Sequence, residues 1–254
     1  MTTEKNNLLI VKSNDLINAR YSLSLSEIRL FLLTIRHIRR TDKDFKVYKI
    51  RISDVVDAID TRSKDVYNQL NQACSRLLSR VMHIPRPNGG FLKVGFASSA
   101  EYKPGEGIIE ISFDPKLKPY LLELKERFTA YDIHNVLSLQ SQFSVRIYEL
   151  LKQFEKIGER TFEVAELREI LGIKPEQYRV YTMFRERVIE KARKELKKNC
   201  DLTFTYKEIK NSRKIVAIKF VITSRSQRTK APDLHSDIRK ELGDLGFNDA
   251  LVSR

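Results

Sequence analysis

The sequence has little cysteine and no long apolar run, and both shortages exclude classes of protein. Only two of its 254 residues are cysteines, and Cys74 and Cys200 lie far apart in helix-like patterns, which indicates buried, reduced thiols and no disulfide framework. No apolar stretch is long enough to cross a bilayer, and the N-terminal MTTEKNNLLIVKSND has only the short apolar run LLIV, which argues against a signal peptide. We therefore expect a soluble, cytoplasmic protein that makes no contact with membranes.

Signals for catalysis and for cofactors are also scarce. The sequence has no G-x-x-x-x-G-K-[ST] loop, which argues against a P-loop ATPase. The four histidines are scattered, and neither they nor the cysteines have the spacing of a metal site. The ten tyrosines have no adjacent metal or His/Arg constellation, so packing is favoured over a role as a DNA-nicking nucleophile. We predict no catalytic residue, no metal and no cofactor.

Positive charge is abundant and unevenly distributed. The 47 Lys and Arg residues exceed the 33 Asp and Glu residues, which gives a net charge of +14. Between Lys174 and Lys230 the sequence has 17 basic and 6 acidic residues, so most of the surplus lies in one region. Such a confined surplus favours a polyanionic partner, most often a nucleic acid, although a solvated Lys-rich surface would have the same composition.

The first half of the chain predicts an ordered series of helices and strands. Apolar residues recur at helical spacing in SEIRLFLLTIRHI (26–38), and a strand-like FKVYKIRI follows. A short helix begins at Ser53, a good N-cap, and a longer one covers about 64–81. Two turn signals, PRPNGG and KPGEG, precede FLKVGFA and IIEISF, which together predict a hairpin. IIEISF is either an exposed edge strand that pairs two subunits or a buried strand.

The second half repeats this order. SVRIYELLKQFEK (144–156) is similar to the first helix, with Arg146 in the place of Arg29. A strand, a short helix ending at Gly172, a turn, a long helix over about 182–198 and two alternating strands follow. Each half therefore has the order helix, strand, short helix, turn, long helix, hairpin. This is the order of a winged helix, a helix-turn-helix followed by a β-hairpin wing.

We predict an α+β protein of two tandem winged-helix domains that are related as an internal repeat. The first domain covers residues 8–126 and the second covers residues 141–224, with a linker at 127–140. The tail at 225–254 is polar and weakly patterned, and we expect it to be partly disordered.

The long helix of the second half has a cationic stripe. On a helical wheel, Arg187, Lys191, Lys194 and Lys198 fall together on the side away from the apolar face. One cationic face on the second helix of a helix-turn-helix suits the major groove, where lysines contact phosphates and residues near the helix N-terminus contact base edges. A solvated helix face is the alternative, but the local charge surplus and the basic turn KNSRK argue for DNA.

Several side chains of this half are candidates for reading bases or binding phosphates. Arg can bind guanine with two hydrogen bonds, Glu can accept from cytosine, and Met can contact the thymine methyl group. The candidates at the start of the helix are Thr182, Met183, Arg185, Glu186 and Arg187. Arg185 lies near the apolar face of the wheel, so an alternative role for its stem is to cover the core edge. In the wing we expect Lys210, Arg213 and Lys214 to bind phosphates or the minor groove.

The long helix of the first half has a different outward face, which is mostly uncharged. Its polar residues include Lys64, Asn68, Gln72 and Arg76. Asn and Gln are able to read adenine, so this helix is a second candidate for DNA contact. A polar face near the DNA backbone, or one used against another protein, fits the same residues.

Four phrases resemble one known family. LIVKSNDLINARYSLSLSEIRLFL, LSLQSQFSVRIYELLKQF, YTMFRERVIEKARKEL and RKIVAIKFVI, in this order, are similar to the iteron-type plasmid replication initiator (Rep) proteins of bacteria. The likeness covers about 8–223. It implies two winged-helix domains that bind repeated origin sequences, with the main sequence readout in the second domain. Arg185 and Arg187 match the basic start of the family's recognition helix, whereas Met183 and Glu186 depart from its pattern.

The resemblance also implies a function and partners. Family members bind origin repeats (iterons) on double-stranded DNA as monomers, open the origin and recruit host replication proteins, namely the host initiator and helicase. Many also form a homodimer through the first domain and repress their own gene at an operator. We therefore expect a cytoplasmic bacterial replication initiator that is not an enzyme. The alternative is a winged-helix transcriptional repressor without initiation activity.

Overall fold

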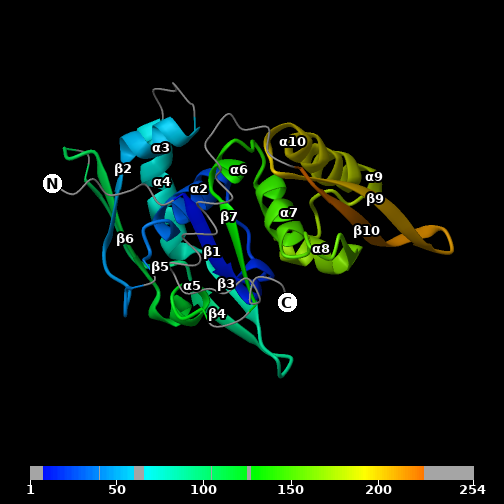
Figure 1. Cartoon of the computed structure of the whole chain (residues 1–254), viewed down its shortest axis with the longest axis horizontal. Helices are drawn as coiled ribbons and strands as arrows, with labels where there is room; N and C mark the ends of the chain where they lie inside the picture. The colour runs from blue at the N-terminus through cyan, green and yellow to red at the C-terminus, as the bar shows by residue number, and fades with distance from the viewer. Residues whose placement is uncertain (1–7, 40, 60–65, 104, 125–126, 226–254) are drawn as a thin grey trace.

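The computed structural model describes residues 8–39, 41–59, 66–103, 105–124 and 127–225. Of the sequence predictions, Lys64 and all but the first residue of the tail at 225–254 lie outside these ranges. No helix within the ranges has the length and apolar character required to span a bilayer. The elements group into two modules that lie side by side, with β1 and β7 near the middle of the molecule (Figure 1).

The first module contains a helix-turn-helix and most of the strands. It begins with β1 (Leu9–Ser13), α1 (Asn14–Ile17) and the buried helix α2 (Leu25–Ile35). Ser24 and Glu27 form a capping box at the N-terminus of α2. The next elements are β2 (Tyr48–Arg51), α3 (Ile52–Ile59), α4 (Val66–Ser79), β3 (Val81–Pro85), β4 (Phe91–Gly95), β5 (Ala97–Lys103) and β6 (Ile108–Phe113). The short helices η1 (Pro115–Leu117) and α5 (Lys118–Leu121) complete the module. Because α3 begins at Ile52, Ser53 lies inside its first turn and is not its N-cap.

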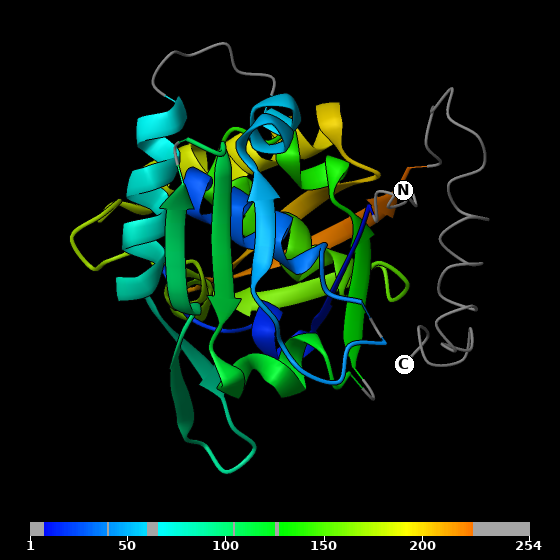
Figure 2. The same cartoon turned by 90° about the vertical axis from the view of Figure 1, so that its left-hand side faces the viewer.

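The strands of the first module form two hairpins where the sequence predicts one. FLKVGFA does not pair as a whole with IIEISF, because β4 folds back on β3, from Val81↔Gly95 to Pro85↔Phe91, and only β5 pairs with β6. The sequence-based prediction misses β3 because the helical pattern of α4 extends to Val81. In the structure Val81–Pro85 is a strand, with every second residue buried. Gly89, at φ 81°, closes the turn between β3 and β4, and the resulting hairpin projects from the body (Figure 2).

β6 is the central strand of the three-stranded sheet β2-β6-β5. Hydrogen-bonded strands flank it on both sides, and its residues alternate in burial, with Ile109, Ile111 and Phe113 buried. Of the two alternatives for IIEISF, the exposed edge strand that pairs two subunits is therefore wrong. The outer strands of this sheet are β2 and β5.

The second module repeats the helix-turn-helix and ends in a long hairpin. β7 (Phe128–Asp132), α6 (His134–Leu137), α7 (Gln142–Lys152), β8 (Glu159–Glu163) and α8 (Val164–Ile170) come first. A continuous helix follows, termed the recognition helix, which consists of α9 (Tyr181–Phe184), the π-helical η2 (Arg185–Glu190) and α10 (Lys191–Asn199). β9 (Leu202–Asn211) and β10 (Lys214–Ser224) form the hairpin termed the wing, and the strands of this sheet pair in the order β8-β10-β9.

Residues 127–140, where the sequence predicts a linker, contain two ordered elements of the repeat itself. β7 pairs antiparallel with β1, from Leu9↔Asp132 to Ser13↔Phe128. Each of these strands leads into a short helix and then into a long buried one, so the segment is the second copy of the start of the first module. The strand is hard to recognise in the sequence because Thr129 and Asp132 are buried along with its aromatic residues, which removes the polar alternation.

The arginine shared by the two repeated helices binds the opposite module in each case. Arg29 of α2 donates to the carbonyl oxygens of Leu137 and Leu139, at 3.0 and 2.9 Å. Arg146 of α7 donates to those of Ile17 and Ala19, at 2.9 and 2.8 Å. Both arginines are buried, so these bonds provide partners for backbone carbonyl groups between the modules. The repeated Arg thus joins the two copies.

A buried ionic cluster lies beside Arg146. Glu149 of α7 accepts hydrogen bonds from Lys12 of β1, from Tyr131 of β7 and from Arg146. Burial acts to raise the pKa of the Glu149 carboxyl, but the charges of Lys12 and Arg146 hold that pKa below its ordinary value. One continuous apolar core extends through both modules around this cluster. The modules are therefore packed as one body.

Gly172 ends α8 and lies against the first module. Its φ is 63°, and the amides of Gly172 and Ile173 donate to the carbonyls of Glu169 and Arg168, at 3.0 and 2.9 Å, as in a Schellman motif. Leu171 is the C-cap and Gly172 follows it in the left-handed conformation, so the predicted end of the helix at Gly172 is confirmed. A Cβ at this position would lie 2.3 Å from the carbonyl oxygen of Tyr21, so glycine allows the second helix-turn-helix to approach the first module this closely.

Candidate nucleic-acid interface

The recognition helix keeps the predicted apolar face but not regular α-helical geometry. Phe184, Val188, Ala192 and Leu196 are all fully buried, as their spacing predicts. The central segment Arg185–Glu190 is π-helical, and Ile189 is fully buried as well. The wider turn therefore places two successive residues in the core. A π-turn of this kind is uncommon and occurs frequently at functional sites.

The cationic stripe of Arg187, Lys191, Lys194 and Lys198 is exposed along its whole length. Lys191, Lys194 and Lys198 follow one another at spacings of three and four within α10, so they share one face. Within the described part of the chain, none of the four has an ion-pair partner. Their charges are therefore available to an external polyanion.

The candidates at the start of the recognition helix divide into exposed residues and one tethered residue. Thr182, Met183 and Glu186 are exposed, as is Arg187. Arg185 is half-buried, and its Nη1 lies 3.8 Å from Oε1 of Glu208 on β9. Arg185 thus packs towards the wing, which is the position expected if its stem covers the core edge.

Two tyrosine–glutamate hydrogen bonds brace the recognition helix against the wing. The Tyr181 hydroxyl donates to Glu208 at 2.9 Å, and the Tyr206 hydroxyl of β9 donates to Glu190 at 2.7 Å. Burial, together with the hydrogen bond to Glu190, raises the pKa of Tyr206 above its ordinary value. The hydrogen bond from Tyr206, with a further one from Arg193, lowers the pKa of Glu190. The helix and the wing are therefore fixed relative to each other.

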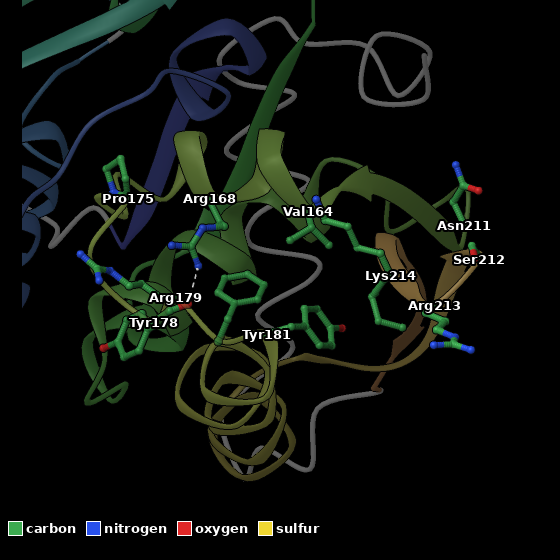
Figure 3. Close-up of a pocket in the computed structure, with 12 residues that line it drawn as sticks. Val164, Arg168, Pro175, Tyr178, Arg179, Tyr181, Asn211, Ser212, Arg213 and Lys214 are labelled. Carbon is green, nitrogen blue, oxygen red and sulfur yellow. Dashed lines mark hydrogen bonds between the residues drawn. The ribbon is translucent and has the colours of Figure 1, made fainter.

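A cavity of about 920 Å³ lies between the start of the recognition helix, α8 and the tip of the wing. Figure 3 shows Arg179 and Tyr178 on one side of it and Arg213 on the opposite side, with Tyr181 between them. Arg168 is engaged within the protein, because its guanidinium donates to the carbonyls of Tyr178 and Gln177 at 3.1 and 2.6 Å. It shapes the turn before the recognition helix, and the remaining cations of the cavity are open to solvent.

Arg179 is a basic residue of this cavity that the sequence pattern misses. It is exposed and immediately precedes Val180, the N-cap of the recognition helix. A helical wheel that begins at Thr182 leaves it out, but its place one residue before the N-cap provides a signal. A cation just before a groove-entering helix is well placed to contact a phosphate.

The wing ends in a basic tip, as the sequence predicts. Lys210, Arg213 and Lys214 are exposed, and Lys214 pairs with Asn211 across the turn. Ser212 has a φ of 56°, in the left-handed region, which allows the chain to reverse here. The tip thus presents cations on a narrow finger beside the cavity.

Helix α4 of the first module presents a nearly neutral face. Asn68, Gln72 and Arg76 are exposed, and Arg76 donates a hydrogen bond to Gln72. The charge of Arg76 therefore lies along the helix surface between polar side chains. Lys64, the remaining candidate of this helix, lies outside the described residues.

The sequence matches two linked families over most of its length. Residues 9–152 match the family described as "Initiator Replication protein, WH1", and residues 163–222 match "Initiator Rep protein, WH2". A replication initiation protein of Escherichia coli is 26% identical over 152 residues, which are 58% of this chain and 47% of that protein. The chain thus spans about half the length of that relative. The PI protein of Escherichia coli is 25% identical over 209 residues, 69% of this chain and 68% of that protein.

The fold is shared with a solved structure of an initiator protein. It is the crystal structure of the Pi initiator protein in complex with iteron DNA, which has a TM-score of 0.71 and covers 88% of this chain and 100% of its own. The two sequences are 22% identical, so this likeness is one of fold. With the WH1 and WH2 matches, it confirms the prediction of two tandem winged-helix domains of mixed helix and strand. The chain belongs to the family of initiator replication (Rep) proteins, as the resemblance of its sequence phrases implies.

Proposed function

We propose that this protein binds repeated sequences of a plasmid origin as a monomer, opens the origin and recruits host replication proteins. The observation that carries the proposal is the exposed cationic stripe on a recognition helix that is braced to a basic wing. The family and the solved complex of the Pi initiator protein with iteron DNA support it.

The recognition helix enters the major groove of double-stranded DNA in this proposal. Lys191, Lys194 and Lys198 contact phosphates and release counterions, while Thr182, Glu186 and Arg187 lie at the base edges. The cations of the cavity and the wing tip hold the neighbouring backbone. These are Arg179, Lys210, Arg213 and Lys214.

Helix α4 makes a second and weaker contact. Its Asn68, Gln72 and Arg76 face solvent, and an amide side chain at a groove can read adenine. Because both modules share one core, the two helices keep a fixed separation, and DNA whose grooves do not match that separation has to bend or twist to meet both. Several copies on adjacent repeats would accumulate this deformation and favour melting of an AT-rich segment.

The proposal extends to protein partners and to repression. Host initiator and helicase bind a surface of the DNA-bound array, and a homodimer formed through the first module represses the protein's own gene. The outer strands β2 and β5 are the edges of the first module's main sheet that remain for such a dimer, since β6 is central.

A plasmid that carries only this gene and its flanking DNA tests the function. We expect the flanking DNA to contain direct repeats about two helical turns apart, and the plasmid to replicate in a suitable bacterial host. A plasmid that fails to replicate while the protein still represses its own promoter would identify a transcriptional repressor. A covalent tyrosyl–DNA product after incubation with supercoiled origin DNA and a divalent metal would identify a nicking enzyme instead.

A further inference from the structure

Two large apolar side chains are exposed at the leading end of the recognition helix. Val180 is 60% exposed and Met183 is 49% exposed. Val180 is the N-cap, and the amide of Met183 donates to the Val180 carbonyl at 3.0 Å, so the two residues are one helical turn apart. Neighbours at this spacing lie on the same side of a helix. Together they form an apolar patch, termed the Val180–Met183 patch.

The surroundings of the Val180–Met183 patch are cationic and polar. Arg179 precedes it, Arg187 follows it by one further turn, and Thr182 between them is exposed with a methyl group of its own. A small exposed apolar surface with a cationic rim is typical of a binding site. The Val180–Met183 patch lies at the end of the helix whose positive charges attract DNA. A partner that is apolar in the centre and anionic around it would therefore complement the patch.

The floor of the DNA major groove has this character at one type of base pair. Thymine is the standard base that presents a methyl group there, and phosphates line both sides of the groove. We propose that the Val180–Met183 patch reads thymine methyl groups and thereby selects thymine at the positions that face the start of the recognition helix. This inference rests on the proposed function, because it requires the recognition helix to enter the major groove.

The experiment removes the methyl group alone. Full-length protein first selects its preferred duplexes from a random library of about 20 base pairs, roughly two helical turns. Each thymine of the selected consensus is then replaced, one at a time, by deoxyuridine, which keeps every hydrogen-bonding group and lacks only the C5-methyl. Fluorescence anisotropy measures the Kd of each duplex.

We expect one or two deoxyuridine substitutions to weaken binding about fourfold each, the value of one buried methyl group. Val180→Ser, Met183→Gln or both should abolish the dependence on the methyl group at those positions, so that thymine and uracil duplexes bind alike. Any effect of the missing methyl on DNA shape would persist in these variants, which separates shape from contact.

Two control variants keep the thymine-to-uracil ratio of the native protein. Ile157→Ala removes an aliphatic side chain that is 68% exposed before β8. The next residue, Gly158, accepts a hydrogen bond from Ile222 near the end of β10, far along the wing from its tip. Lys194→Ala removes a proposed phosphate contact, so it should weaken binding to both duplexes by the same factor.

Two results would overturn the inference. If the consensus duplex binds tightly but every deoxyuridine substitution changes its Kd by less than about twofold, methyl groups are not read and the proposed function stands. If no sequence is enriched over random DNA, the recognition helix reads no bases, and both the inference and sequence-specific origin binding fail.

Discussion

The recognition helix of the second module and helix α4 of the first occupy the same place in a repeated fold, yet they offer DNA different surfaces. The cationic stripe of the recognition helix, Arg187, Lys191, Lys194 and Lys198, is exposed and has no ion-pair partner among the described residues. Helix α4 presents mainly amides, and its one described cation in this face, Arg76, bonds to Gln72. Duplication of a fold thus does not duplicate its function, because the function depends on the surface residues.

The interior of the two modules shows the opposite behaviour. The repeated arginine has one role in both copies, since Arg29 and Arg146 each bind backbone carbonyls of the other module. A buried guanidinium without a partner is costly in free energy, so the removal of the backbone partners of either arginine would destabilise the protein. The buried arginines therefore hold the two modules together, whereas the exposed faces of α4 and the recognition helix make the modules different.

The largest effect is expected at the crossed arginines. Arg146 also bonds to Tyr21 and to Glu149, so Arg146→Ala leaves Glu149 with a weaker set of partners and should destabilise the protein by about 3–5 kcal/mol. Arg29→Ala breaks two bonds to carbonyls and should lower the free energy of unfolding by about 1–3 kcal/mol. Denaturant unfolding of the full chain measures both. An equal or larger loss in Arg29→Ala would contradict the greater importance of the Arg146 cluster.

A second prediction concerns base reading by the two helices. Arg187→Ala should cost about 1–3 kcal/mol of binding free energy on the preferred duplex and relax the preference at one base pair. Gln72→Ala, the matched change on α4, should cost less than about 1 kcal/mol. Anisotropy with the consensus duplex and its single-base variants measures both. An Arg187 variant that loses the same affinity on all sequences would show that Arg187 contacts a phosphate and no base.

The smallest effect is expected at the brace between the recognition helix and the wing. Tyr206→Phe removes the hydrogen bond to Glu190 and should lower the free energy of unfolding by about 0.5–1.5 kcal/mol. Glu190 keeps its contact with Arg193, so the helix remains in place and DNA affinity falls by less than about threefold. Tyr181→Phe, at the other brace, serves as the matched variant. If either change abolishes DNA binding without unfolding the protein, the brace has a larger role in presenting the wing than its hydrogen bonds suggest.

Much of the fold follows from local patterns in the sequence. Spacing of apolar residues predicts α2, α4, α7 and the recognition helix to within a few residues, and Gly172 correctly predicts the end of α8. Each of these features has one strong local signal, which is either the helical spacing of apolar residues or a glycine at the end of a helical pattern. The exposure of the cationic stripe also follows, because Phe184, Val188, Ala192 and Leu196 fix which side of the helix is buried.

What the sequence does not predict depends on pairing between distant segments. The helical pattern of α4 extends to Val81, but Val81 begins β3, which pairs with β4 across the turn at Gly89. β7 has no polar alternation, since Thr129 bonds to Asn14 and is buried by the pairing with β1. Arg185 is drawn towards Glu208 of β9, a contact that no helical wheel contains. Contacts between segments distant in the sequence therefore determine which segments form strands and where site side chains lie.

The salt dependence of DNA binding tests most directly whether the recognition helix is the main DNA surface. The triple variant Lys191→Ala, Lys194→Ala, Lys198→Ala is compared with Asn68→Ala, Gln72→Ala, Arg76→Ala on the same consensus duplex. Each lost phosphate contact reduces the slope of log affinity against log salt by about 0.9. We predict a reduction of roughly three units for the recognition-helix variant and at most about one for the α4 variant. The reverse order, or an unchanged slope in the lysine variant with its fold intact, would contradict this account.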